Sequence, residues 1–180
     1  MTRDDHRALL GNGIAAPGET WADLGSGSGA FTTALAEAVG PTGVIYSVDR
    51  NMHSLRAQER EMRARFPALR LSIMKADFND TLPLTGLDGI VMANSLHFQS
   101  DACATLTHAA QWLKVGGRLI VVEYDVEGAS PWVPHPVPWA RLPGIMACAG
   151  FRGTRLIDVR PSRYHGKVYS AVGVTSPAAE

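Results

Sequence analysis

The sequence contains very few cysteines and carries no net charge. Only two cysteines, Cys103 and Cys148, occur among 180 residues, and neither has neighbours at metal-ligand spacing. We expect two reduced, buried thiols rather than a disulfide or a redox pair. The 17 Lys and Arg residues balance 17 Asp and Glu residues, so the chain lacks the charge that would attract nucleic acid or an anionic membrane. A small or neutral partner is therefore favoured.

Long apolar runs are missing as well. No uninterrupted apolar stretch approaches the roughly 18 residues of a membrane span, and acidic residues stand near the N-terminus where a secretory signal needs positive charge. We therefore expect a cytoplasmic protein that makes no membrane contact. A hydrophobic content of 46% with 19% charged residues is typical of a globular chain, and the length suits one domain.

What the sequence does contain is a cluster of glycines between an apolar strand start at 21–22 and a helical run over 31–39. Gly25, Gly27 and Gly29 fall within five residues. Glycines at this spacing let the backbone turn sharply from strand to helix, and the free N–H groups of the helix start then point at a ligand. The pattern predicts a nucleotide-type binding loop.

The spacing of the loop leaves two ligand classes open. Gly25, Gly27 and Ala30 satisfy a dinucleotide pattern, and Asp49 follows about 20 residues after the loop, as in dehydrogenases. Asp23, however, stands directly before the loop at the strand end. A carboxylate there would repel a pyrophosphate but would suit the ammonium group of an amino acid.

Downstream of the loop, apolar strand patterns alternate with helical ones. Strands are predicted over 43–48, 69–75, 87–93 and 118–124, and helices over 51–66 and 102–113. This alternation is typical of a parallel sheet covered on both faces. Two further strands over 154–160 and 167–174 predict a terminal hairpin, which would make the last strand antiparallel.

Several motifs, taken in their order along the chain, resemble one family. The run Asp23 to Gly29 resembles the first motif of class I, Rossmann-like S-adenosylmethionine-dependent methyltransferases of the type 11/25-like kind. Val48-Asp49, Ala76-Asp77, the strand at 87–91 and the glycine turn within 113–121 resemble the later motifs. The resemblance implies an α/β three-layer sandwich with a mostly parallel seven-stranded sheet in the order 3-2-1-4-5-7-6, the last strand antiparallel. It implies a single methyltransferase domain over 1–180 with its core at about 20–174.

The resemblance also implies a set of residues that bind the cofactor S-adenosyl-L-methionine. Asp23 and the loop would hold the methionine end, Asp49 the ribose hydroxyls, and Asp77 the exocyclic amine of adenine. The backbone N–H of Phe78 would serve a ring nitrogen, Met52 would lie against the adenine face, and Asn94 would line the route to the methyl group. The complete set is Asp23, Gly25, Ser26, Gly27, Gly29, Asp49, Arg50, Met52, Asp77, Phe78 and Asn94.

Methyl transfer requires a general base only if the acceptor must lose a proton. The candidates are His97, His135, Glu123 and Tyr124. His97 lies in an Asn-x-Leu-His stretch similar to that of quinone-biosynthesis C-methyltransferases. His135 belongs to the proline-rich segment 126–140, which is either a lid over the acceptor or a stiff crossover loop. No metal is expected, because the ligands of catechol-methylating enzymes are not matched.

The sequence therefore predicts an enzyme that methylates a small-molecule acceptor by in-line displacement. An NAD-type oxidoreductase and a non-catalytic domain that retains the fold are the alternatives. The chain has no large cap inserted between its strands, so the acceptor site must be built from the N-terminal segment, the proline-rich loop or a second subunit. A homodimer is accordingly a candidate assembly.

Overall fold

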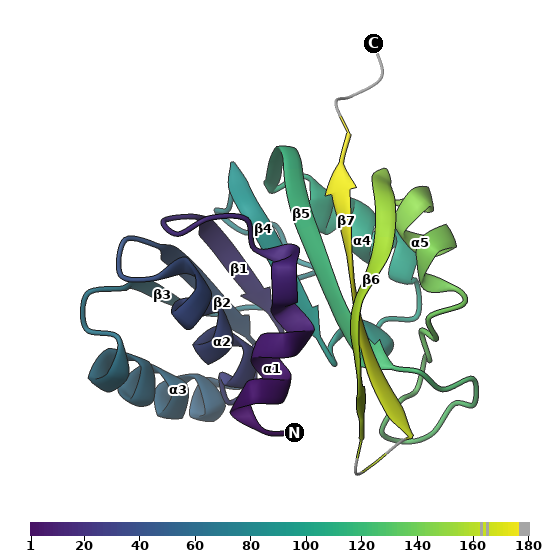
Figure 1. The fold of residues 1–180 in the computed structure, drawn as a ribbon, viewed down its shortest axis with the longest axis horizontal. Helices are drawn as coiled ribbons and strands as arrows, with labels where there is room; N and C mark the ends of the chain where they lie inside the picture. The colour runs from purple at the N-terminus through teal and green to yellow at the C-terminus, as the bar shows by residue number, and fades with distance from the viewer. Residues whose placement is uncertain (163, 165, 177–180) are drawn as a thin grey trace.

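The computed structural model describes residues 1–162, 164 and 166–176, and a seven-stranded sheet carries helices on both of its faces (Figure 1). The strands are β1 (Thr20–Leu24), β2 (Val44–Asp49), β3 (Arg70–Lys75), β4 (Leu87–Ala93), β5 (Leu113–Tyr124), β6 (Phe151–Pro161) and β7 (Lys167–Thr175). The helices are α1 (Arg3–Leu10), α2 (Ala30–Val39), α3 (Met52–Arg65), α4 (Ala102–Ala110) and α5 (Leu142–Cys148), with 3-10 turns η1 (Gly11–Gly13) and η2 (Leu96–Phe98).

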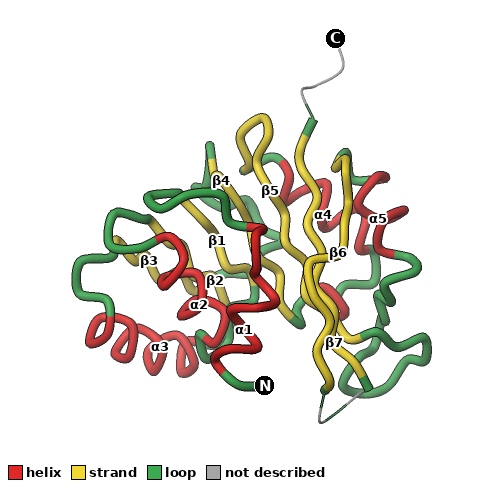
Figure 2. Tube along the Cα trace, in the orientation of Figure 1, coloured by secondary structure: helices red, strands yellow, loops and turns green. Residues whose placement is uncertain are grey.

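The order of the strands is β3-β2-β1-β4-β5-β7-β6. The first five strands pair in parallel, whereas β7 runs antiparallel to both β5 and β6. Both the predicted order and the antiparallel last strand are confirmed. Figure 2 shows α1, α2 and α3 on one face of this sheet and α4 and α5 on the other.

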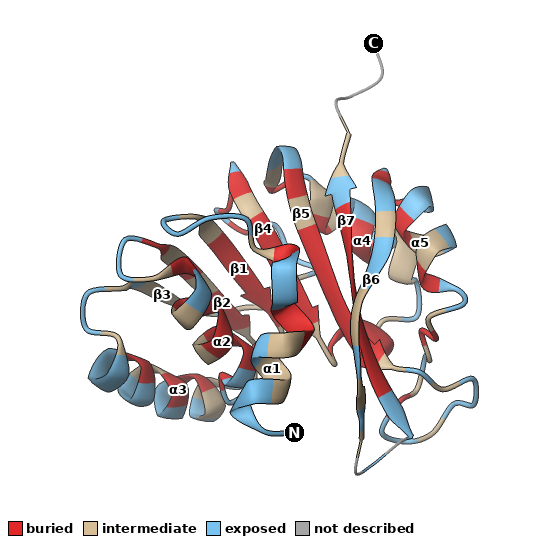
Figure 3. Ribbon diagram, in the orientation of Figure 1, coloured by how far each residue is buried: buried red, intermediate tan, exposed pale blue. Residues whose placement is uncertain are grey.

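The sheet is apolar on both faces because successive side chains of a strand point to opposite sides. In β1, Trp21 packs with the cluster that includes α1 and α2, whereas Ala22 and Leu24 pack with the cluster under α4 and α5. Burial is therefore nearly continuous along the central strands (Figure 3). A strand covered on both sides needs such an uninterrupted apolar run.

One strand begins earlier than the sequence predicts. β5 starts at Leu113, where the pattern predicted the end of a helix and a turn before residue 118. Leu113 pairs with Leu87 of β4, and the register then shifts before Gly89 pairs with Arg118. The glycine turn at 116–117 is therefore an irregularity inside the strand pair rather than a break in front of it.

The two cysteines correct another prediction. Cys103 of α4 and Cys148 of α5 form a disulfide, with their Cα atoms 6.0 Å apart. They were predicted to be separate buried thiols, yet Cys148 is exposed and Cys103 is only partly buried. The reason is that α4 and α5 pack side by side on one face of the sheet, which brings together residues 45 positions apart.

Candidate functional site

The candidate site lies at the carboxyl end of the parallel strands, where the glycine loop joins β1 to α2. Gly25, Gly27 and Gly29 all adopt positive φ, at 80°, 53° and 89°. A side chain at Gly25 would place its Cβ 2.5 Å from Ser95, and one at Gly29 would meet Gln58 at 2.4 Å. The loop therefore needs glycine both for its left-handed backbone and for close packing.

Asp49, at the end of β2, stabilises the glycine loop by hydrogen bonding to its backbone. Its Oδ2 accepts a hydrogen bond from the backbone N–H of Gly27 at 2.8 Å, and its Oδ1 accepts from Asn51 at 2.7 Å. Each carboxylate oxygen can accept more than one hydrogen bond, so Asp49 retains capacity for a ligand hydroxyl. The acid that sequence spacing singled out is thus part of the loop's own structure.

Asp23 is buried beneath the loop in a polar network. Its exposed fraction is 1%, and its Oδ2 accepts from the Thr32 hydroxyl at 2.6 Å. Thr32 in turn accepts from Gln58 Nε2 at 2.5 Å. Burial raises the pKa of Asp23 to about 7; the Thr32 hydrogen bond opposes this rise and the nearby charge of Asp49 adds to it. A cationic ligand group beside Asp23 would relieve the cost of burying its charge.

Thr32 and Gln58 were missed at the sequence level. Both lie on helices whose amphipathic pattern assigns them no role, and Gln58 comes from α3, far along the chain. The signal that could have found them is a polar residue on the buried face of each helix, since buried polar groups need partners.

A small cavity of about 110 Å³ opens beside Asp49. Its lining includes Arg50, Ala76 and Phe78 as well as the loop residue Gly25. Asp77 lies between Ala76 and Phe78 in the sequence. Its carboxylate, however, pairs with Arg50 at 3.2 Å and accepts from the backbone N–H of Asn79 at 2.9 Å. Neither Asp77 nor Met52 is among the residues lining this cavity, so their predicted contacts with adenine stay predictions.

A second cavity of about 220 Å³ lies on the other side of the loop. It is lined by Asp23, by the loop from Gly25 to Ser28, by Ala30, Phe31, Ala93 and Asn94, and by Met1 and His6 from the N-terminal segment. No motif in the sequence connected α1 with the site. The helix reaches it because α1 folds back against α2.

The third cavity is the largest of the three, about 600 Å³, and is aromatic. Asn94, His97, Phe98, Tyr124, Trp132 and Tyr164 line it. Trp132 and Tyr164 are 76% and 82% exposed, so they stand at its mouth. Trp132 comes from the predicted lid segment, which is tied across the strand ends by the backbone hydrogen bond from His135 to His97 at 3.0 Å.

His97, which lines the aromatic cavity, forms a buried pair with Glu123. Glu123 Oε2 lies 2.6 Å from His97 Nδ1, and Glu123 Oε1 accepts from the backbone N–H groups of Leu96 and His97. Both side chains are at most 2% exposed. A carboxylate on Nδ1 favours the tautomer that leaves Nε2 free to accept a proton. Two of the predicted base candidates are thus brought together, while His135 is exposed and does not line the cavity.

Asn94 is shared by all three cavities. Among the described residues it is the one non-glycine with positive φ, at 51°, a conformation that asparagine tolerates better than most residues. Its Oδ1 is buried and has no hydrogen-bond partner within the chain. A buried acceptor without a partner needs an explanation, and a ligand passing between the cavities would supply the missing donor.

Among the residues that the structure describes, no three His, Cys, Asp or Glu side chains are grouped so as to hold a metal ion. Over the same residues, no helix combines the length and apolar character needed to cross a membrane.

The chain matches a known protein family. The family model described as a methyltransferase domain matches residues 16–142, more than half of the chain.

Curated proteins are similar to this chain over part of its length. The 2-phytyl-1,4-naphtoquinone methyltransferase of Trichormus variabilis is 30% identical over 112 residues, covering 61% of this chain and 48% of that protein. A ubiquinone/menaquinone biosynthesis C-methyltransferase of Burkholderia vietnamiensis is 30% identical over 132 residues, covering 69% of this chain and 53% of that protein. The chain thus spans about half the length of these relatives.

Solved structures share the fold. The YcgJ protein of Bacillus subtilis superimposes with a TM-score of 0.78 at 13% identity, covering 97% of this chain and all of that one. A SAM-dependent methyltransferase from Aquifex aeolicus gives a TM-score of 0.69 at 18% identity, covering 97% of this chain and 98% of that one.

Proposed function

Because the chain belongs to the methyltransferase-domain family, we propose that it transfers a methyl group from S-adenosyl-L-methionine to a small-molecule acceptor. The observation that carries the proposal is the position of Asn94, where two cavities flanking the glycine loop meet the aromatic cavity. A donor spanning the first two cavities would have its central atom at the entrance to the third. We treat residues 1–180 as one methyltransferase domain.

The residues on either side of the loop fit the two ends of the cofactor. Asp23, buried and with a raised pKa, suits the ammonium of the methionine end. Asp49 has acceptor capacity for the ribose hydroxyls, and the small cavity beside it, with Phe78 in its wall, suits adenine. The unpartnered Oδ1 of Asn94 is a further acceptor on the methionine side. When bound, S-adenosyl-L-methionine supplies a methyl group that is already activated for transfer.

The protein's main task is then to hold the acceptor in line with that methyl group. The aromatic cavity suits a flat, largely apolar molecule, since Phe98, Tyr124 and Trp132 offer ring faces and edges. Two curated relatives are a 2-phytyl-1,4-naphtoquinone methyltransferase and a ubiquinone/menaquinone biosynthesis C-methyltransferase, which supports a small-molecule acceptor here. The segment 126–140 acts in this proposal as a lid that contributes Trp132.

For an acceptor that must lose a proton, His97 is the base. Its Nε2 takes the proton, while Nδ1 stays hydrogen-bonded to Glu123, whose charge stabilises the imidazolium that forms. Glu123 therefore acts as a positioning residue. Tyr124, whose pKa is raised by burial and by the charge of Glu123, stays a neutral wall of the cavity near pH 7.

The alternative of an NAD-type oxidoreductase is disfavoured by Asp23. Its carboxylate lines the cavity beside the loop, where a dinucleotide would place its pyrophosphate.

Calorimetric titration with S-adenosylhomocysteine and with NAD distinguishes these functions. We expect one equivalent of S-adenosylhomocysteine to bind and NAD not to bind; the reverse result would favour the oxidoreductase. Release of labelled methyl groups to a panel of phenolic and enolic acceptors then separates an enzyme from a non-catalytic domain. In that assay His97→Ala should lower turnover with cofactor affinity intact, whereas His135→Ala, outside the cavity, should not. Equal rates for the two variants would remove the assigned base.

A further inference from the structure

We propose that His6, on the N-terminal helix α1, binds the carboxylate of the cofactor's methionine end. The inference rests on the proposed function, because it concerns the same cofactor. It adds a binding residue from outside the region that the family model matches, which begins at residue 16.

His6 belongs to the wall of the cavity that also contains Asp23. This cavity of about 220 Å³ is lined by His6, by the loop from Gly25 to Ser28 and by Phe31 at the start of α2. The imidazole ring is half-buried and packs against the Phe31 ring, with 4.9 Å between centroids. The contact with Phe31 therefore holds the ring in the wall of the cavity that Asp23 also lines.

The charged and hydrogen-bonding groups of the cavity favour a contact between His6 and the ligand carboxylate. The methionine end carries an ammonium and a carboxylate, and Asp23 can satisfy only the ammonium. Among the described lining residues, the His6 ring and the α-amino group of Met1 can carry a positive charge. Burial and the nearby Met1 ammonium lower the pKa of His6, so its ring meets the ligand near pH 7 as a neutral hydrogen-bond donor. The hydroxyl of Ser26 accepts from Ser47 at 2.7 Å and donates to Gln58 Oε1 at 3.4 Å, so its proton is already used. An imidazole is a hydrogen-bond donor whether neutral or charged, and a bond to a carboxylate is charge-assisted.

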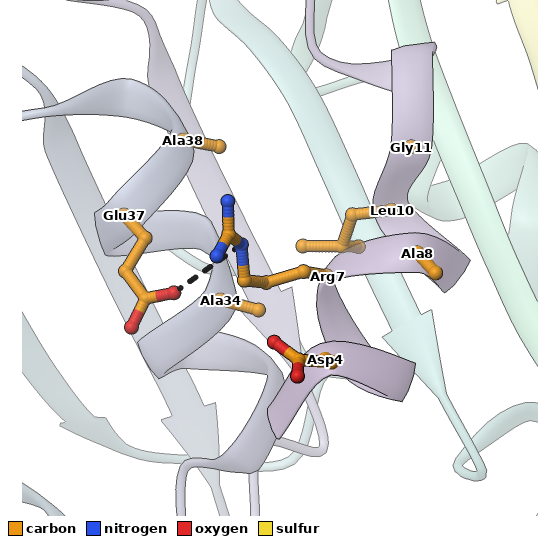
Figure 4. Close-up of a pocket in the computed structure, with 8 residues that line it drawn as sticks. All are labelled: Asp4, Arg7, Ala8, Leu10, Gly11, Ala34, Glu37 and Ala38. Atoms are coloured by element: carbon orange, nitrogen blue, oxygen red, sulfur yellow. Dashed lines mark ion pairs between the residues drawn. The ribbon is translucent and has the colours of Figure 1, made fainter. Parts of the chain in front are cut away.

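α1 is held firmly enough to present His6 to a ligand. The helix begins with a capping box in which Thr2 and Asp5 exchange hydrogen bonds, and its Leu9 and Leu10 are buried in the core. Arg3 and Arg7 both pair with Glu37 of α2, the latter at 3.7 Å. Figure 4 shows the Arg7 side chain extending from α1 to Glu37 of α2. These contacts fix α1 beside the loop without using His6.

The test compares two ligands that differ only in the carboxylate. Calorimetry measures the binding of S-adenosylmethionine and of decarboxylated S-adenosylmethionine to the wild type, to His6→Ala and to His6→Gln. We expect His6→Ala to weaken S-adenosylmethionine binding about tenfold, the size of one hydrogen bond to a charged group. The same variant should leave the affinity for the decarboxylated ligand within about twofold. His6→Gln, which keeps a donor, should recover part of the loss.

His53→Ala is the matched control, since His53 is exposed on α3 and does not line this cavity. Urea unfolding of each variant establishes that the fold is intact. Equal weakening of both ligands by His6→Ala would mean that the ring only packs against the cofactor and would overturn the inference. So would unchanged affinity for S-adenosylmethionine. Failure of the wild type to bind S-adenosylmethionine at all would instead overturn the proposed function, and this inference with it.

Discussion

Replacing Asp23 by Asn should stabilise the protein at alkaline pH while weakening cofactor binding. The carboxyl group is buried, and its pKa is raised from 3.8 to about 7. The folded protein therefore binds a proton at Asp23 more tightly than the unfolded chain does. The contribution of Asp23 to the free energy of unfolding is fully present below pH 3.8 and is lost as the pH rises through about 7.

The size of this pH-dependent loss of stability follows from the difference between the unfolded and folded pKa values of Asp23. At 1.36 kcal/mol per pH unit, the wild type loses about 4 kcal/mol of unfolding free energy from Asp23 over the whole range. Between pH 5 and pH 8.5 the loss is about 3 kcal/mol, because part of it has already occurred by pH 5. An asparagine cannot ionise, yet its carbonyl can still accept from Thr32.

Urea unfolding of the wild type and of Asp23→Asn at pH 5 and pH 8.5 measures this difference. Other titrating groups are common to both proteins, so the change in the difference between the two free energies isolates Asp23. Parallel pH dependences, agreeing within about 1 kcal/mol, would refute the reasoning. In calorimetry, the wild type's affinity for S-adenosylhomocysteine should rise as the pH passes through about 7, since the ionised carboxylate pairs with the ammonium. The variant's affinity should be weaker and should lack this dependence.

Three further changes test other parts of the structure. Asp49→Ala should weaken the binding of S-adenosylhomocysteine by about 1.5–3 kcal/mol, as for hydrogen bonds to a charged group; unchanged affinity in calorimetry would remove the ribose-binding role. Glu123→Gln should slow methyl transfer about a hundredfold by releasing His97 from its tautomer, with cofactor affinity unaltered, and a wild-type rate would contradict the assignment. Cys148→Ser should lower the unfolding free energy by about 2–4 kcal/mol through loss of the 45-residue cross-link. Reductant should destabilise the wild type to the same level without affecting the variant, and a wild type insensitive to reductant would disprove the disulfide.

Much of the fold could be predicted because its strands are buried on both faces. The apolar run of β2 (Val44–Asp49) ends at the polar residue Asp49, and the run of β4 (Leu87–Ala93) is followed directly by Asn94, so the carboxyl end of each strand could be predicted. The terminal hairpin was equally clear, because two strand patterns flanked a short polar turn. The start of β5 was not, since its first pairing at Leu113 depends on a register shift opposite Gly89.

The site was predictable where it is built from one continuous segment. The spacing of residues in the sequence is enough to predict the glycine loop and Asp49. The positive φ angles of the loop explain the glycines, and the hydrogen bond from Gly27 explains Asp49. The pairing of His97 with Glu123 lay beyond local pattern, because it depends on the adjacency of β4 and β5 at their carboxyl ends. The cytoplasmic location expected from the N-terminal residues stays a prediction.

Contacts between distant helices were the least accessible to sequence reasoning. Cys103 and Cys148 show no spacing signal, and only the packing of α4 against α5 joins them. His6 likewise has no motif around it, and it reaches the cavity beside the glycine loop only because α1 packs on α2.

A crystal structure with S-adenosylhomocysteine bound tests the central claim most directly. We predict that its sulfur lies beside Asn94, facing the cavity of His97 and Tyr124, with the adenosyl group next to Asp49 and the amino-acid end next to Asp23. A sulfur atom found away from Asn94, or a ligand lying wholly in the aromatic cavity, would contradict the account.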